Sequence, residues 1–528
     1  MPAIPSFPFT NVAAVSEWFN FHHTIANRPV SLYLTPEALA DADGAPPSAV
    51  RQAQALNAIL AYCADANPPE RLCTLGAKWS MSNVLDPANI VLDPGAFNKI
   101  AKVNGAWLTK DYQDDARPRG GVPVVVQGGT QIGYLNQKLG ESGLALATSG
   151  ANDGHRFAGC IATGTHGSAL RVGAVHDTVL AIYLVVGPNR GVVLQPATRR
   201  FTGDLASWFE KSTNIPTLDL ADDDLYHAAL VALGSLGFVH SVIVEAVPLY
   251  QFVGRVLSLS LNDPKLWHAL ETLDTTVLDS RPQPDHFQVV LSPYATGSDP
   301  GAFVTMMWKQ KPTSPYAPPT PVTAMAATDT TRVLSSLIGR FDNPMSGTLV
   351  EQILNSQTQA QFTPGNINPM FPGQTFGPTN LPPGNGRSTE IVVDHQNTGV
   401  TIRTILAALR NEANAGRHLL GALGVRFVPK TNALLGMNIH PVNTYVEVPS
   451  INSSAITTIH KACWSALTAA NITYTCHWGQ EYGMDAKSVG AYFGDRVSRW
   501  KIARAKLLDS PALRTVFSTP LLANVGLL

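Results

Sequence analysis

The sequence predicts an α+β protein in which short strands and helices are interleaved. Between Ser48 and Cys63 the apolar residues recur at the three- and four-residue spacing of an amphipathic helix. Runs of β-branched residues follow, such as 124–126, and they predict strands. Gly-Gly and Pro-Asn pairs after these runs mark the turns. Because such segments alternate along the chain, we expect helices packed in layers on sheets.

The first region, residues 1–250, is expected to form two α+β subdomains that divide near residue 120. After the helix at 48–63, the sequence predicts a strand over 71–76 and a helix over 132–142. Two strands then flank the Pro-Asn-Arg-Gly turn at 188–191. A helix, a glycine-rich turn and a final strand complete the region.

The second region, residues 251–475, is expected to form a domain with an antiparallel sheet flanked by helices. Residues 311–386 interrupt it as a Pro-rich insert, within which helices are predicted over 331–338 and near 348–356. Loops this long are uncommon unless they are functional or disordered. We expect the last segment, 476–528, to return to the first region.

Composition narrows the function classes. Thirty-seven Lys and Arg residues against 38 Asp and Glu residues give a formal net charge of −1, so we expect no nucleic-acid partner. No apolar run is long enough for a membrane span, and no signal peptide is recognisable, so we expect a soluble cytoplasmic protein. The five scattered cysteines form no Cys-x-x-Cys pair, and we expect reduced buried thiols and no metal site.

Glycine is most concentrated between Ser149 and Thr178. Glycine allows the backbone to approach a flat or phosphorylated ligand closely and to adopt positive φ. Tight turns in a β-rich core are the alternative explanation of the same pattern.

Four segments in their order resemble one family. They are AGCIATGTHGS at 158–168, the helix, strand and loop at 48–80, ALGSLGFVHSVIVEAVPL at 232–249, and CHWGQ at 476–480. The sequence resembles the vanillyl-alcohol-oxidase-type (PCMH-type) FAD-binding oxidoreductases, in particular the branch of aldonolactone oxidases, alditol oxidases and flavin-linked cholesterol oxidases. This resemblance implies an FAD-binding domain at 1–250 and a substrate domain at 251–475.

The resemblance also implies the cofactor-binding residues. The loop at 76–80 would aim backbone N–H groups at the pyrophosphate, the glycine-rich run would line the flavin, and the turn at 237–239 would hold the adenine. The residues so implied are Gly76, Ala77, Lys78, Trp79, Ser80, Gly150, His155, Gly159, Thr163, Gly164, Thr165, His166, Gly167, Gly237, Val239 and Trp478. Lys78 adds charge to the loop or is an ordinary solvated lysine, and His166 is expected to bond across the flavin loop.

Three residues of the cofactor-binding region depart from the family pattern. Trp79 stands where many relatives carry a histidine joined to the flavin, so we expect FAD to bind non-covalently. Lys78 replaces a glycine, so the loop backbone is expected to differ locally. His155 stands where the berberine-bridge branch attaches flavin through a cysteine. A His155 linkage is therefore the alternative, and a surface or hydrogen-bonding histidine is the other explanation.

The catalytic candidates come from the second region and the last segment. Glu390 matches a family active-site glutamate, and Arg426 matches the arginine of the Glu-x-Arg strand, in which Gly424 replaces the acid. Arg426 stays charged at any working pH and can hold a developing alkoxide. His477 and Gln480 match the family His-Trp-Gly-Lys motif, with an amide in place of the lysine. His440 is a further candidate base. A solvated strand residue and a histidine bonded to backbone are the alternatives for Glu390 and His440.

The resemblance, with these residues, implies an FAD-dependent oxidoreductase that oxidises the CH–OH group of a small molecule, with hydride passing to flavin N5 and O2 as acceptor. One alternative is a dehydrogenase that uses another redox carrier. Another is a diverged flavin-fold binding module. The apolar residues of the insert suggest a lid over a larger or more apolar substrate than a sugar. Because Gly424 and Gln480 replace the acid and the lysine of the family pattern, they make a standard sugar-lactone oxidase less favoured.

Overall fold

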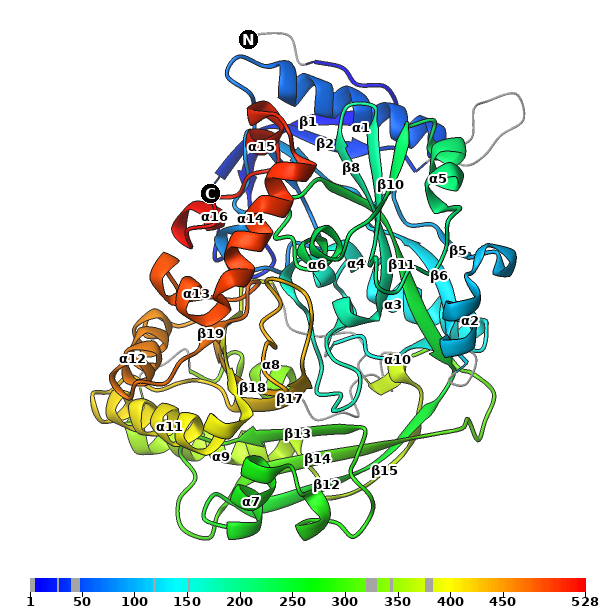
Figure 1. Cartoon of the computed structure of the whole chain (residues 1–528). Helices are drawn as coiled ribbons and strands as arrows, with labels where there is room; N and C mark the ends of the chain where they lie inside the picture. Colours follow the sequence, from blue (N-terminus) through cyan, green and yellow to red (C-terminus); the bar gives the residue numbers. More distant parts are fainter. Residues whose placement is uncertain are drawn as a thin grey trace.

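The computed structural model describes residues 5–25, 28–38, 48–116, 120–150, 152–319, 330–341, 345–375 and 383–528 (Figure 1). Parts of the Pro-rich insert, at 320–329, 342–344 and 376–382, lie outside the described residues. Helices and strands are interleaved throughout, which confirms the predicted α+β class. The strands form three sheets.

The first sheet has the order β1-β2-β4-β3 and lies against helix α1. Its elements are β1 (Thr10–Trp18), β2 (Arg28–Pro36), α1 (Ser48–Asp65), β3 (Leu72–Thr74) and β4 (Ile90–Leu92). α1 buries Leu56, Ile59, Leu60 and Cys63 on one face, as the apolar spacing predicted.

The second sheet has the order β10-β9-β8-β11-β6-β5, with β7 paired to β11. Its strands are β5 (Ile100–Lys102), β6 (Val122–Gln127), β7 (Leu144–Leu146), β8 (Val179–Gly187), β9 (Arg190–Gln195), β10 (Thr217–Ala221) and β11 (Phe238–Pro248). The accompanying helices are α2 (Lys110–Ala116), α3 (Ile132–Glu141), α4 (Phe157–Thr163), α5 (Leu205–Thr213) and α6 (Asp223–Leu230). Every residue of β8 is buried, which explains its unbroken apolar sequence.

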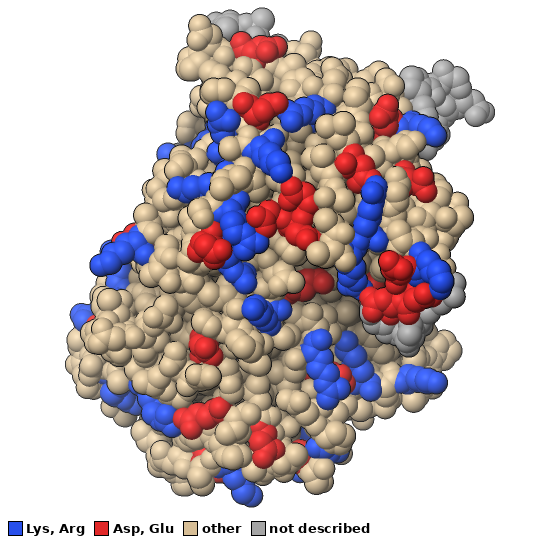
Figure 2. Space-filling model, in the orientation of Figure 1, with Lys and Arg blue, Asp and Glu red and all other residues tan. Residues whose placement is uncertain are grey.

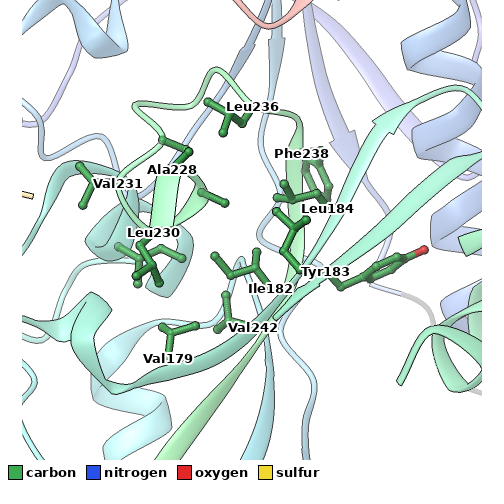
Figure 3. Packing of buried hydrophobic residues seen from close by; sticks show 14 of the residues in the cluster. Val179, Ile182, Tyr183, Leu184, Ala228, Leu230, Val231, Leu236, Phe238 and Val242 are labelled. Atoms are coloured by element: carbon green, nitrogen blue, oxygen red, sulfur yellow. The ribbon is translucent and has the colours of Figure 1, made fainter. Parts of the chain in front are cut away.

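The core of this sheet lies between β8, β11 and α6. Figure 3 shows Ile182 of β8 beside Val242 of β11, with Ala228 and Leu230 of α6 near them. Each of these four side chains is buried. This packing fixes α6 and the glycine-rich turn after it against the sheet.

The third sheet is antiparallel throughout, in the order β15-β12-β14-β13-β17-β18-β16-β19, which confirms the predicted antiparallel sheet. Its strands are β12 (Gln251–Ser260), β13 (His286–Leu291), β14 (Pro300–Gln310), β15 (Gly365–Met370), β16 (Gly386–Asp394), β17 (Leu423–Pro429), β18 (Val442–Ile451) and β19 (Thr475–Cys476). The helices are α7 (Pro264–Thr272), α8 (Thr330–Leu337), α9 (Gly347–Gln361), α10 (Pro372–Thr375), α11 (Thr398–Asn414) and α12 (Ile456–Ala469). α8 and α9 confirm the two helices predicted in the insert.

The two faces of the third sheet differ in chemistry because successive side chains point to opposite faces. Ile391, Val425 and Val446 join one apolar cluster with residues of α7, α11 and α12. Their neighbours in the sequence, Glu390 and Arg426, point the other way, toward a cavity. The alternation in β16, β17 and β18 therefore delivers charged groups to one place.

The last segment folds back along the first region. It contains α13 (Ala486–Phe493), α14 (Asp495–Leu507), α15 (Pro511–Val516) and α16 (Pro520–Asn524). α14 contacts α6, α15 contacts α1, and α16 contacts the short helix η1 (Asn83–Leu85). Figure 1 shows these red helices beside the blue amino-terminal elements. The domain boundaries at 120, 250 and 475 stay predictions.

The remaining short 3₁₀ helices connect these elements. They are η2 (Gly105–Trp107), η4 (Val175–Thr178), η5 (Thr275–Val277) and η6 (His395–Asn397). Figure 2 shows basic and acidic side chains intermingled on the face in view. Within the part of the chain that the structure describes, no helix has both the length and the apolar character needed to cross a bilayer.

Candidate active site

One cavity, with about 1450 Å³ of space free of protein atoms including its open mouth, lies where the first region meets the polar face of the third sheet. It brings together fourteen of the residues that the sequence singled out. These are Gly76, Ala77, Lys78, Trp79, Ser80, His155, Gly159, Thr163, Thr165, His166, Glu390, Arg426, His477 and Gln480. Thr330, Thr331 and Leu334 of α8 also line it.

The loop at 76–80 forms one wall of the cavity directly after β3. Its five successive backbone N–H groups make no hydrogen bond to any described residue, although all five residues line the cavity. Lys78 has φ +65°, a left-handed conformation that suits glycine best. The replacement of glycine by Lys78 therefore does not prevent this conformation. Unpartnered amides in such a loop form a concave site for an anion.

The charge near this loop comes from a residue that the sequence analysis missed. The Lys78 ammonium lies over the rings of Trp18 and Tyr33, 5.8 and 5.4 Å from their centroids. Arg156 instead reaches the loop, where its Nη1 donates to the Gly76 carbonyl at 3.2 Å and to Asp93 at 2.5 Å. Its place as a basic residue within the glycine-rich segment was the available signal.

Trp79 is held on both sides by aromatic rings. Its indole stacks on Phe21 with centroids 4.2 Å apart, and the His155 ring lies 4.9 Å away. The Phe21 amide donates to the Lys78 carbonyl at 2.7 Å, and His22 Nδ1 donates to the Gly386 carbonyl at 2.9 Å. The connection between β1 and β2 thus joins the loop to β16. His22 lines the cavity and had no sequence signal.

His155 is a cavity residue with one ring nitrogen engaged. Its Nδ1 lies 3.3 Å from the Asn152 carbonyl, which can only accept, so Nδ1 carries the proton. Burial lowers the pKa of His155, which favours the neutral ring. Nε2 then keeps its lone pair. The alternative flavin linkage through His155 stays a prediction.

The glycine-rich run is partly helical, because Phe157, Cys160 and Ile161 are buried at helical spacing in α4. Gly164 ends α4 with φ +77°, and a Cβ there would lie 2.6 Å from Met437 Cε. Gly164 does not line the cavity itself, but its backbone conformation sets the positions of its neighbours Thr163 and Thr165, which do. Cys160 is a buried thiol, as expected.

A cluster of charged side chains forms the opposite wall. Glu390 accepts from His166 Nε2 at 3.0 Å and from Arg426 Nη1 at 3.1 Å. Arg426 Nη1 also lies 2.9 Å from Glu447 Oε2. Arg426 thus has a second carboxylate partner, although Gly424 lacks the expected acid. Glu390 is buried, so the solvated-strand alternative is wrong.

His166 contacts an acceptor at each ring nitrogen. Nδ1 lies 2.8 Å from the Gly167 carbonyl, so it carries a proton. Burial works to raise the pKa of Glu390, but the His166 and Arg426 contacts outweigh it and lower the pKa from 4.5 to about 2. Glu390 is therefore ionised beside Arg426 and His166.

His166, Glu390 and His477 also have the spacing of a metal site, with ligand atoms within 4.8 Å of one another. Glu390 already accepts from His166 and from Arg426. The cationic Arg426 on this carboxylate disfavours a metal ion there.

His477 and Gln480 enter the cavity from the turn after β19. Burial lowers the pKa of His477 to about 4, and its Nδ1 accepts from the Gly479 amide at 3.0 Å. Nε2 therefore carries the proton, and His477 is a neutral donor in this state. Gln480 Oε1 is buried without a hydrogen-bond partner among the described residues.

Seven predicted residues lie outside the cavity lining: Gly150, Gly164, Gly167, Gly237, Val239, Trp478 and His440. His440 Nδ1 lies 3.2 Å from Asp394. Gly237, at φ +126°, immediately precedes β11, and a Cβ there would lie 3.1 Å from the Val185 carbonyl oxygen. Trp478 is buried, and its indole N–H donates to the Leu435 carbonyl at 2.8 Å. Leu233 and Gly234, in the turn before β11, line the cavity instead.

Glu390 gives a pH prediction. Its pKa is lower in the folded chain than the ordinary 4.5, so it stabilises the fold fully above about pH 4.5. That contribution is lost as the pH falls toward about 2. Urea unfolding of the wild type and Glu390→Gln across this range should show a stability difference that shrinks below pH 4.5. A difference that stays constant from pH 7 to the acid limit would contradict this assignment.

Known proteins resemble the chain in fold and in part of the sequence. The structure matches cholesterol oxidase from B. sterolicum with a TM-score of 0.68 and 13% identity over 99% of each chain. A solvent-stable cholesterol oxidase matches with a TM-score of 0.65. At this identity the match shows the fold: that of the cholesterol oxidases.

Parts of the sequence also match curated oxidoreductases. L-gulono-1,4-lactone dehydrogenase of Mycobacterium tuberculosis is 25% identical over 43% of this chain and 41% of its own length. D-arabinono-1,4-lactone oxidase of Yarrowia lipolytica is 28% identical over 28% of this chain and 25% of its own. The chain thus matches less than half the length of these curated relatives. No protein-family model matches. The fold and these matches confirm the resemblance to the vanillyl-alcohol-oxidase-type FAD-binding oxidoreductases.

Proposed function

We propose that the chain binds FAD non-covalently in this cavity and oxidises the CH–OH group of a small molecule, with O2 as electron acceptor. The observation that carries the proposal is that one cavity joins five unpartnered backbone amides to the Glu390–Arg426–His166 cluster. The amides suit two phosphates, and the charged cluster suits a reacting hydroxyl.

The residues present fit FAD at both ends of the cavity. The loop at 76–80 and Arg156 would hold the pyrophosphate, and Gly159, Thr163 and Thr165 would flank the ring system. The buried, unpartnered Gln480 Oε1 can accept a hydrogen bond, so it suits a ligand that presents an N–H group, as the flavin pyrimidine does. When bound, FAD would supply the hydride acceptor.

The protein residues would orient the substrate and stabilise charge. Arg426 would hold the substrate oxygen, because its guanidinium stays charged, and the hydroxyl proton would pass to water at the open mouth of the cavity. Glu390 fixes Arg426 and His166, and its low pKa makes it a poor proton acceptor. His477 would donate its Nε2 proton in a hydrogen bond to substrate or cofactor.

The cavity lining favours a substrate with an apolar skeleton. Leu334 of α8 faces the cavity together with Met81, Leu85 and Pro449. We infer that α8, within the insert, forms one wall of the substrate site. Alcohols with apolar rings should therefore be better substrates than aldonolactones or alditols.

Anaerobic stopped-flow measurements test the function. Bleaching of the flavin absorbance by an apolar alcohol, followed by fast recovery on mixing with O2, is the expected result. Recovery only with a dye would indicate a dehydrogenase. A protein that retains FAD yet is bleached by no alcohol, lactone or alditol would support the binding-module alternative.

The cofactor linkage gives a separate prediction. Because Trp79 cannot form the flavin bond, acid precipitation should release all flavin into the supernatant, measured by absorbance. The same assay on His155→Ala is the control. Flavin that stays with the wild-type pellet and is released from His155→Ala would instead show a linkage through His155.

A further inference from the structure

Glu447 stands in one row of the third sheet with Glu390 and Gly424. The register pairs Glu390 of β16 with Glu447 of β18, and Glu447 with Gly424 of β17. The three residues are direct neighbours across three strands, so they share one face of the sheet. Glu447 and Glu390 both line the cavity.

The absence of a side chain at Gly424 makes room for the Glu447 carboxylate. A Cβ at Gly424 would lie 3.3 Å from Glu447 Oε2, 3.3 Å from Arg426 Nη1 and 3.0 Å from Thr330 Cγ2. Each distance is shorter than a comfortable contact, so a larger residue would displace one of the three groups. The Glu447 carboxylate thus lies beside Gly424, in space that a side chain at position 424 would narrow.

The Glu447 carboxylate is held from three directions. Arg426 Nη1 lies 2.9 Å from Oε2, the Thr330 hydroxyl donates to Oε2 at 2.9 Å, and the Ser388 hydroxyl donates to Oε1 at 3.2 Å. The side chain is 14% exposed. Charge-assisted hydrogen bonds in such a site are short and directional. They fix the position of Arg426 as well as that of Glu447.

We propose that Glu447 is a positioning residue that holds Arg426 at the cavity and sets the net charge there. The proposal rests on the proposed function for its consequence in catalysis. Glu390 and Glu447 hold the same guanidinium nitrogen from two strands. Loss of Glu447 leaves Arg426 with one of these two carboxylates and makes the cavity more positive by one charge.

The added positive charge and the displacement of Arg426 change two different quantities, the midpoint potential of the flavin and the rate of its reduction. A more positive cavity favours the anionic reduced flavin, so Glu447→Gln should raise the midpoint potential. A displaced Arg426 stabilises the substrate oxygen less well, so flavin reduction at saturating substrate should slow by about tenfold. A slower reduction despite a higher potential is the expected combination. A merely structural residue would leave the potential unchanged.

Urea unfolding tests the contact without any flavin. Glu447→Gln should lower the unfolding midpoint, and this lowering should shrink to less than half in the Arg426→Met background, because the partner is already gone. Glu351→Gln is the matched control. Glu351 pairs with Arg410 at 2.7 Å, does not line the cavity, and should leave the potential and reduction rate unchanged.

The outcomes separate the two proposals. A wild type that binds no flavin contradicts the proposed function, and the urea experiment alone then decides the role of Glu447. A flavin-loaded wild type with an unaltered potential and rate in Glu447→Gln overturns the role of Glu447 in catalysis. Equal midpoint shifts in the wild-type and Arg426→Met backgrounds overturn the contact itself.

Discussion

Arg426→Met should retain FAD but slow flavin reduction by roughly two to three orders of magnitude, the effect of removing one preorganised electrostatic donor. The Arg426 side chain is only 6% exposed and lies between Glu390 and Glu447. Water cannot easily replace its charge there. Stopped-flow reduction under anaerobic conditions measures the effect.

The same variant leaves two buried carboxylates without their shared cation. Breaking a buried pair in this way costs about 3–5 kcal/mol, so circular dichroism should accompany each rate measurement. Arg410→Met is the control, because it breaks the Glu351 pair away from the cavity. Reduction at the wild-type rate in folded, flavin-loaded Arg426→Met would show that Arg426 is structural and that the active site is placed wrongly.

Gly164→Val should abolish FAD retention. A β-branched residue opposes φ +77°, and its Cβ would meet Met437 Cε at 2.6 Å. The end of α4 would move, and Thr163, Thr165 and His166, which line the cavity, would move with it. The flavin content of the purified variant, measured by absorbance against protein, tests this.

Gly143→Val is the matched control for this variant. Gly143 has φ +72°, and nothing lies within 4 Å of a Cβ placed there. It imposes the same kind of backbone strain without contact to the cavity, so flavin content should stay at the wild-type level. Wild-type flavin content in Gly164→Val as well would contradict the role given to the glycine-rich run.

The sequence predicted the elements with strong periodicity. The helix of α1 and the buried strand β8 follow from apolar spacing, and the antiparallel third sheet follows from repeated short strands. β1 and β15 could not be predicted, because most of their residues are not buried and leave no hydrophobic pattern. α4 was not predicted because it is short and lies within the glycine-rich segment.

The site residues that could be predicted from the sequence are those that belong to contiguous motifs. The loop at 76–80, His166 and His477 lie in such motifs, and all reach the cavity. His22 reaches it through tertiary contacts alone. Glu447 carried a weak signal, since the alternation in NTYVEVPS places it on the face of Tyr445. Its pairing with Gly424 depends on strand register, which one sequence does not reveal.

The visible absorption spectrum of the purified protein tests the central claim most directly. We expect a yellow protein with the two absorption bands of oxidised flavin and close to one FAD for each chain. A colourless protein that also takes up no FAD when refolded in its presence would contradict the proposal that this cavity binds the cofactor.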